Sequence, residues 1–199
     1  MDGQANWQLY GRTDEPPDGR TDPKPDERTD APTNWPTTTG EPLVLFVCWG
    51  NICRSPMAEM VARKWATRKE VRARFASAGV SAEEQGHDID PRAAEVLAEH
   101  GYQVTRHVAR KVTKDDLAEA NLIVGMEQLH LDRVELMGAS PSKTYLLSDF
   151  DRDAPPGIGI PDPWYGPESG FQDTLASIEA AMPELMRRIV ELSRRDQPE

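Results

Sequence analysis

The chain has 199 residues, of which 38% are hydrophobic and 29% are charged, and it carries a formal net charge of −11 at pH 7. This length suits one domain with a sizeable core. No apolar run reaches the length of a membrane span, and we expect no signal peptide because the first residues lack a basic region followed by an apolar stretch. The negative charge argues against a nucleic-acid partner, and two cysteines only five positions apart predict a reducing, cytoplasmic setting.

Residues 1–40 differ in composition from the rest of the chain. They are dense in Pro, Asp, Thr and Arg, and the tripeptide Arg-Thr-Asp recurs with its arginine at positions 12, 20 and 28. A repeat this short, with so much proline and charge, cannot build a hydrophobic core. We therefore expect a disordered, acidic, proline-rich extension over residues 1–40, acting as a passive tail or as a docking segment, followed by a folded domain over residues 41–195.

From residue 43 onward, short apolar runs alternate with helical patterns. We expect strands over residues 43–47, 74–80, 121–126 and 143–147, and helices that begin near Ser55 and Thr113 or span residues 90–100, 127–137 and 169–193. Pro183, inside the last helix, predicts a kink. Strands that alternate with helices predict an α/β fold in which a doubly wound parallel sheet carries helices on both faces. Ligands of such sheets bind beyond the carboxyl ends of the strands.

The loop after the first strand has the sequence Val-Cys-Trp-Gly-Asn-Ile-Cys-Arg-Ser-Pro at residues 47–56. The loop N–H groups and the helix start, where Ser55 is the expected cap, point positive dipoles at one spot, which suits a bound phosphate. Arg54 adds a planar fork of donors that can grip two phosphate oxygens. The same field stabilises a thiolate and makes Cys48 a candidate nucleophile; the alternative is a small buried hydrophobic residue. Gly50 allows the backbone to turn inward.

Residues 47–59 resemble the active-site signature of the low-molecular-weight protein tyrosine phosphatases. The resemblance runs from about residue 43 to about residue 192 and includes the motifs Ser-Ala-Gly at 77–79, His-Val-Ala-Arg-Lys-Val-Thr at 107–113 and Asp-Pro-Trp-Tyr-Gly at 162–166. It implies a Rossmann-like fold with a four-stranded parallel sheet in the order 2-1-3-4, and hydrolysis of phosphotyrosine in proteins through a phosphocysteine intermediate. It also implies phosphate and other oxyanions as ligands, no metal or other cofactor, and the monomeric state usual in the family.

Four aspartates, Asp149, Asp151, Asp153 and Asp162, lie in the segment before the last helix, and spacing alone does not single out a general acid among them. The resemblance selects Asp162, because the acid of the family lies in an Asp-Pro pair followed by aromatic residues. It implies that Asp162 protonates the leaving phenolate oxygen and then takes a proton from the attacking water.

Aromatic residues are expected to wall the pocket. Trp164 and Tyr165 follow Asp162 and carry rings that can stack on a flat phenyl group, and Trp49 is the candidate for the opposite wall. Ordinary packing is the alternative for each. Ile52 bears on the substrate, because the related arginine phosphatases carry threonine at this place and isoleucine favours an aryl ester over a charged guanidinium.

The resemblance further implies a supporting network. Asn51 is expected to hydrogen-bond to Ser77, and Ser55 to donate to the thiolate of Cys48. Cys53 is implied as the partner of Cys48 in a reversible disulfide that protects the site from over-oxidation; a buried bystander thiol is the alternative.

The histidines are expected to be structural or on the surface. None of His87, His100, His107 and His130 is spaced from another as metal ligands are. His107 matches a family position with a structural role. Its pairing is left open, because Glu127 stands where the family often has aspartate.

Three alternatives to a tyrosine phosphatase stay open. They are a protein arginine phosphatase, a non-catalytic phosphate-binding module, and an arsenate reductase that uses an external small thiol. An internal thiol relay for arsenate is excluded, because no cysteine follows Cys53.

Overall fold

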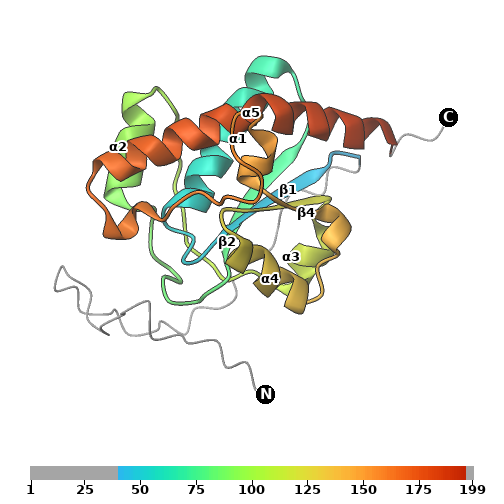
Figure 1. Ribbon diagram of the computed structural model, residues 1–199, viewed down its shortest axis with the longest axis horizontal. Coiled ribbons are helices and arrows are strands. Elements are labelled where there is room, and N and C mark those ends of the chain that lie inside the picture. The colour runs from blue at the N-terminus through green and yellow to red at the C-terminus, as the bar shows by residue number, and fades with distance from the viewer. Residues whose placement is uncertain (1–39, 196–199) are drawn as a thin grey trace. The chain divides into compact units, whose positions relative to one another are not determined.

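The computed structural model describes residues 40–195, and the expected extension over residues 1–40 lies outside the described residues except for its last position. Four parallel strands form one sheet in the order β2-β1-β3-β4 (Figure 1). The strands are β1 (Leu43–Cys48), β2 (Arg74–Gly79), β3 (Leu122–Gly125) and β4 (Thr144–Leu146). The predicted parallel α/β fold and strand order are confirmed, and every strand boundary lies within one residue of its expected position.

Helices cover both faces of this sheet. They are α1 (Arg54–Lys69), α2 (Pro91–Glu99), α3 (Lys114–Glu119), α4 (Gln128–Leu136) and α5 (Ser169–Arg195). On one face α1 packs against α5, with α2 beside α5, while α3 and α4 lie on the other side (Figure 1). The last helix continues through Pro183, so the proline does not end it, and the expected kink there stays a prediction.

The helix starts follow from local hydrogen bonds, with one correction to the sequence prediction. Asp90 caps α2 by accepting a backbone N–H two residues further on at 2.8 Å, and Thr113 forms a capping box with Asp116 at the start of α3. The predicted cap of α1 by Ser55 is wrong. Ser55 is the second residue of the helix and not its N-cap, so its hydroxyl points into the preceding loop and lies 3.0 Å from the sulfur of Cys48.

The core is built around the central strand. All six residues of β1 are buried, as expected for a parallel strand with neighbours on both sides and helices on both faces. Phe46 in β1 stacks on Phe75 in β2, with ring centroids 6.5 Å apart. A strand buried in this way gives Cys48, at its carboxyl end, a fixed position.

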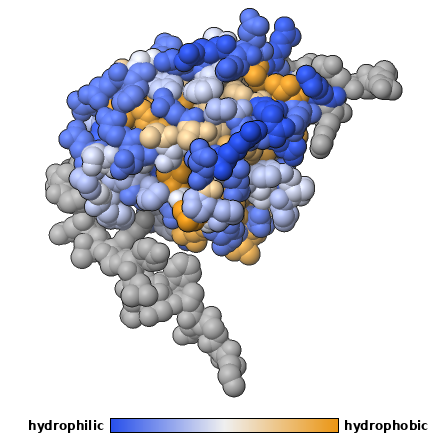
Figure 2. All heavy atoms as spheres, turned by 45° about the horizontal axis from the view of Figure 1, so that its top comes forward, coloured by the Kyte–Doolittle hydropathy of each residue, from blue (hydrophilic) through white to orange (hydrophobic). Residues whose placement is uncertain are grey.

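The surface differs from this core. Hydrophilic residues cover most of the face seen in Figure 2, with hydrophobic residues in small patches between them. No helix within residues 40–195 is long and apolar enough to cross a membrane.

Candidate active site

The cysteine loop, residues 48–55, joins β1 to α1 at the carboxyl edge of the sheet. Three of its carbonyl groups accept N–H donors from the segment after β2 and from the start of α2. These bonds run from Val80 to Cys48 (2.9 Å), from Ser81 to Trp49 (3.0 Å) and from Asp90 to Ile52 (2.8 Å). The C=O and the following N–H of a trans peptide point in opposite directions, so the N–H groups that follow these carbonyls point away from these donors. Backbone N–H groups of this kind are candidates to bind an anion.

Two glycines let neighbouring segments approach this loop closely. A Cβ atom on Gly79 would lie 2.7 Å from the carbonyl oxygen of Trp49 and 3.1 Å from the carbonyl carbon of Gly50. A Cβ atom on Gly50 would lie 2.8 Å from Cγ of Glu84. A side chain at position 50 would therefore crowd that of Glu84, which the absence of a side chain on glycine avoids.

Asn51 ties the cysteine loop to two other segments, β2 and residues 107–110. It is fully buried and has a φ of 63°, in the left-handed region that asparagine tolerates better than most residues. Its Nδ2 donates to the hydroxyls of Ser55 (2.9 Å) and Ser77 (3.0 Å), so the predicted contact with Ser77 is present. Its Oδ1 accepts the backbone N–H of Arg110 at 3.0 Å, and its backbone oxygen lies 2.6 Å from Nε2 of His107. The pairing of His107 that the sequence left open is thus with Asn51.

The sulfur of Cys48 lies between two hydrogen-bond donors. The backbone N–H of Asn51 lies 3.3 Å from the sulfur and the hydroxyl oxygen of Ser55 lies 3.0 Å from it. Because the Ser55 oxygen already accepts an N–H from Asn51, its own hydrogen can be directed at the sulfur. Both groups can therefore donate a hydrogen bond to a sulfur at this position.

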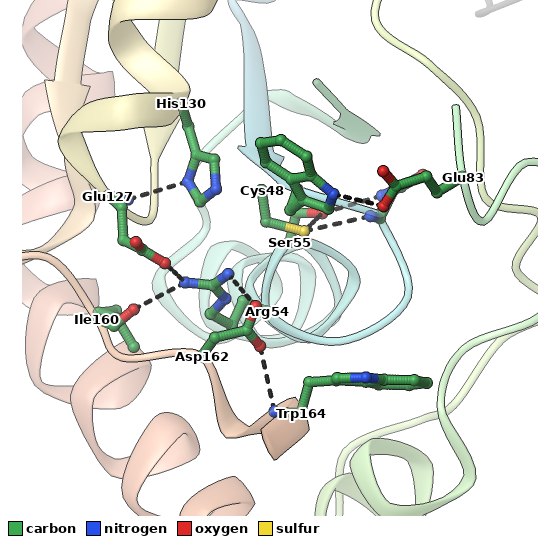
Figure 3. A network of polar contacts seen from close by, with 11 residues as sticks. Cys48, Arg54, Ser55, Glu83, Glu127, His130, Ile160, Asp162 and Trp164 are labelled. Atoms are coloured by element: carbon green, nitrogen blue, oxygen red, sulfur yellow. Dashed lines mark hydrogen bonds and ion pairs between the residues drawn. The ribbon is translucent and has the colours of Figure 1, made fainter. Parts of the chain in front are cut away.

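The guanidinium of Arg54 links the cysteine loop to the segment between β4 and α5 (Figure 3). It is 2% exposed. Nη2 donates to the Asp162 carboxylate at 2.6 Å, and Nη1 donates to the Ile160 carbonyl at 2.9 Å and pairs with the Glu127 carboxylate. Burial works against its charge, but the negative groups Asp162, Cys48 and Glu127 raise the pKa of Arg54 above its ordinary value.

The acid loop, residues 159–166, carries Asp162 and is tied to Met126 and to Arg54. The N–H of Ile160 donates to the carbonyl of Met126, just after β3, at 2.7 Å. Asp162 contacts Arg54 with one carboxylate oxygen and accepts the backbone N–H of Trp164 with the other at 3.2 Å. The second bond caps the short 3₁₀ turn Pro163–Tyr165. The carboxylate that the resemblance selected is therefore brought to the arginine of the cysteine loop.

Two residues at the site, Glu127 and His130, were missed as site residues by the sequence reasoning. Glu127 lies two residues after the end of β3, and its carboxylate pairs with Arg54. Its backbone N–H donates to Nδ1 of the buried His130 at 3.0 Å (Figure 3). Burial and the charges of Arg54 and Arg133 lower the pKa of His130 to about 3, so the ring is neutral at pH 7. The available signal for Glu127 was an acidic residue just beyond the carboxyl end of a central strand.

The three aromatic residues predicted to wall the pocket, Trp49, Trp164 and Tyr165, differ in position and in exposure. Trp164 lies on the Asp162 side of Arg54 in Figure 3, whereas Glu83, which accepts the Trp49 indole N–H at 2.7 Å, lies on the Cys48 side. Tyr165 is 73% exposed.

Two of the remaining predicted residues, Ile52 and Cys53, are buried residues of the cysteine loop. They are 8% and 5% exposed and belong to the hydrophobic core. Burial, reinforced by the nearby Asp90, Cys48 and Asp162, raises the pKa of the Cys53 thiol, which keeps it protonated. Both cysteines are free thiols in the structure, so the reversible disulfide implied by the family stays a prediction.

Comparison with known proteins agrees with this geometry. The family model for low molecular weight phosphotyrosine protein phosphatases matches residues 43–196. Low molecular weight protein-tyrosine phosphatase A of Mycobacterium bovis is 38% identical over 149 residues, which cover 73% of this chain and 90% of that protein. The low molecular weight phosphotyrosine protein phosphatase of Schizosaccharomyces pombe is 41% identical over 138 residues, covering 65% of this chain and 85% of that protein.

A solved structure supports the same assignment. The crystal structure of a protein tyrosine phosphatase from Entamoeba histolytica has a TM-score of 0.71 and 29% identity, covering 76% of this chain and 98% of that one. The fold and the site define a phosphatase-like α/β protein with a cysteine and an arginine in the loop between β1 and α1. This chain belongs to the low-molecular-weight protein tyrosine phosphatase family, as the sequence motifs indicated.

Proposed function

We propose that this protein hydrolyses phosphotyrosine in proteins through a phosphocysteine intermediate. The observation that carries the proposal is the ion pair that joins the cysteine loop to the acid loop. Arg54 lies in the same loop as Cys48, and its guanidinium binds the Asp162 carboxylate from the acid loop at 2.6 Å. The relatives named above are protein tyrosine phosphatases, which supports the same activity.

In the first chemical step, the phosphoryl group enters the cysteine loop and its oxygens bind the loop N–H groups and Arg54. The Cys48 thiolate attacks phosphorus opposite the phenolate oxygen. The S–P bond forms as the P–O bond to the phenolate breaks, and the protonated carboxyl of Asp162 gives its proton to the leaving oxygen. The released product is the phenol side chain of tyrosine.

In the second step, water attacks the phosphocysteine. The Asp162 carboxylate takes a proton from this water, the new O–P bond forms, and the S–P bond breaks. The Ser55 hydroxyl, 3.0 Å from the sulfur, stabilises the departing thiolate. Inorganic phosphate leaves, and both Cys48 and Asp162 return to their starting states.

The substrate preference follows from the walls of the pocket. Trp49 and Trp164 serve as aromatic walls for the phenyl ring, with the exposed Tyr165 at the rim. Ile52 favours an aryl ester over the charged guanidinium of phosphoarginine. The matched substrates for this part of the proposal are phosphotyrosine and phosphoarginine peptides of one sequence, and phosphotyrosine is expected to be turned over faster.

The proposal also covers the bounds of the catalytic domain, the oligomeric state and the cellular compartment. The phosphatase domain spans residues 41–195, in line with the family match over 43–196. The protein works as a monomer on tyrosine-phosphorylated proteins in the reducing cytoplasm, where its two free thiols stay reduced. Analytical ultracentrifugation of the full chain, with and without reductant, tests whether the protein is a monomer.

The decisive experiment is trapping of the covalent intermediate. The protein should hydrolyse a phosphotyrosine peptide in the presence of a chelator, and acid quenching during turnover should leave phosphate on Cys48. Cys48→Ser should bind the peptide without releasing phosphate, with circular dichroism to show that the variant is folded. Full activity of this variant would end the proposal, and arsenate-dependent oxidation of an added thiol in place of phosphate release would indicate an arsenate reductase.

A further inference from the structure

Trp49 is held from several directions by residues that the reaction itself does not use. Its carbonyl accepts the N–H of Ser81 at 3.0 Å. Its indole N–H donates to the Glu83 carboxylate at 2.7 Å. The guanidinium of Arg133, on α4, lies over the indole ring, 4.5 Å from the ring centroid. The ring is thus held at its edge by the segment after β2 and at its face by a helix on another part of the sheet.

We propose that Glu83 and Arg133 are positioning residues that fix the Trp49 ring as a wall for aromatic substrates and so set a preference for aryl over alkyl phosphates. This inference rests on the proposed function and adds to it the two residues that give the site part of its selectivity. Within residues 40–195, neither Glu83 nor Arg133 forms a hydrogen bond or an ion pair with Cys48, Arg54 or Asp162.

The physical argument is one of preorganisation. A tryptophan at the rim of a pocket that rotates in the unbound protein loses side-chain entropy when a ligand stacks on it, and this loss weakens binding. A ring held by a hydrogen bond and a cation–π contact has lost this freedom before the ligand arrives. The two holding groups also carry opposite charges, so their combined effect on the charge of the phosphate group is small.

The test separates the aryl ring from the phosphate group. Phenylphosphonate and methylphosphonate share a head group and are not hydrolysed, so calorimetric dissociation constants for both, measured on the full chain, give an aryl selectivity ratio without turnover. Glu83→Ala and Arg133→Ala should each weaken phenylphosphonate about three- to tenfold more than methylphosphonate. Glu83→Gln, which keeps a carbonyl acceptor for the indole N–H, should retain most of the selectivity. Arg187→Ala removes a charge from an exposed ion pair on α5 and serves as the control for net charge.

A double-mutant cycle tests whether both residues act through Trp49. In a Trp49→Ala background, Glu83→Ala and Arg133→Ala should no longer change the selectivity ratio. An unchanged ratio in the single variants, or an equal change that persists without Trp49, would overturn the inference, as would equal selectivity ratios in the wild type and Trp49→Ala. Absence of phosphotyrosine hydrolysis by the wild type would instead overturn the proposed function, because the phosphonate measurements do not depend on turnover.

Discussion

The cysteine loop and the acid loop meet at Arg54, yet they are held in place very differently. In the cysteine loop, Cys48, Asn51, Arg54 and Ser55 are all at most 3% exposed, and Asn51 binds groups on β2 and on the segment around residue 110. In the acid loop, the side chain of Asp162 is 32% exposed and Tyr165 is 73% exposed. The proposed nucleophile, Cys48, is therefore built into the core, whereas the proposed acid, Asp162, is placed by a few contacts, one of them to the arginine of the other loop.

This contrast has a consequence for mutations. A change inside the cysteine loop removes buried hydrogen bonds and should lower both stability and rate. A change in the acid loop removes a proton donor from a partly exposed segment, and it should lower the rate while the stability stays close to that of the wild type.

The largest expected effect is on the rate, from Asp162→Asn. Asparagine keeps the size of the side chain but cannot donate and accept the reaction proton, so kcat for a phosphotyrosine peptide should fall about 10²- to 10⁴-fold. The free energy of unfolding in urea should stay close to the wild-type value. Asp153→Asn, an exposed change in the segment leading to the acid loop, is the matched control and should leave kcat unchanged. An equal loss in both variants would show that Asp162 is not the acid.

The second expected effect is on stability and rate together, from Asn51→Ala. The change removes the side-chain acceptor of the Arg110 backbone N–H and the donor to Ser55 and Ser77. The free energy of unfolding should fall by about 1–3 kcal/mol, and kcat should fall because Ser55 loses its orientation toward Cys48. Asn121→Ala is the control, because its Oδ1 accepts one N–H, from Leu43, at 2.9 Å at the other end of β1. It should cost stability but not kcat, and the reverse pattern would contradict the comparison of the two loops.

The sequence predicted the cysteine loop more fully than the acid loop for a physical reason. Cys48, Gly50 and Arg54 lie within one strand–loop–helix unit, so local dipoles, the helix start and the arginine fork point to an anion site without knowledge of the rest of the chain. Asp162 was one of four equivalent aspartates by spacing, and the family resemblance was needed to select it. Its contact with Arg54 spans 108 positions along the chain, and no local pattern encodes it.

The same limit explains the errors and omissions around the loop. Ser55 looked like a helix cap because the pattern of a serine before a proline is local, but the helix starts two residues earlier, with Cys53 at the N-cap position. The pairing of Arg54 with Glu127 joins positions 73 apart, and the packing of Arg133 on Trp49 joins α4 to the cysteine loop. Such contacts follow from the strand order, which brings the ends of β1 and β3 together. The sequence predicted that order through the resemblance, but not the side chains that meet there.

A smaller effect is expected on the pH dependence of stability, from His130. In the unfolded chain its pKa is near 6.5, whereas in the folded protein it is about 3. Between these values the unfolded state binds more protons, so the contribution of His130 to stability is complete above pH 6.5 and is lost as the pH falls toward 3. The expected slope from this one group approaches about 1.4 kcal/mol per pH unit. Urea unfolding between pH 7 and pH 4 should therefore show a weaker acid dependence in His130→Asn, and an unchanged slope would count against a buried neutral ring.

The smallest expected effect comes from Glu127→Gln, and it concerns the ground state of Arg54. In the structure Arg54 pairs with two carboxylates, those of Glu127 and Asp162, and an entering phosphate must compete with them. Glutamine keeps the length of the side chain and removes its charge, so the guanidinium should attract the phosphate dianion more strongly. The inhibition constant of inorganic phosphate should fall about three- to tenfold, a range that fits the loss of one partly exposed carboxylate near a buried arginine. Glu119→Gln removes a carboxylate that pairs with Arg74 on the surface, and it should leave the inhibition constant unchanged. Weaker phosphate inhibition in Glu127→Gln would mean that Glu127 orients Arg54 for the phosphate and does not compete with it. The geometry of the cysteine loop would then depend on the segment after β3, to which the acid loop is also bound through Met126.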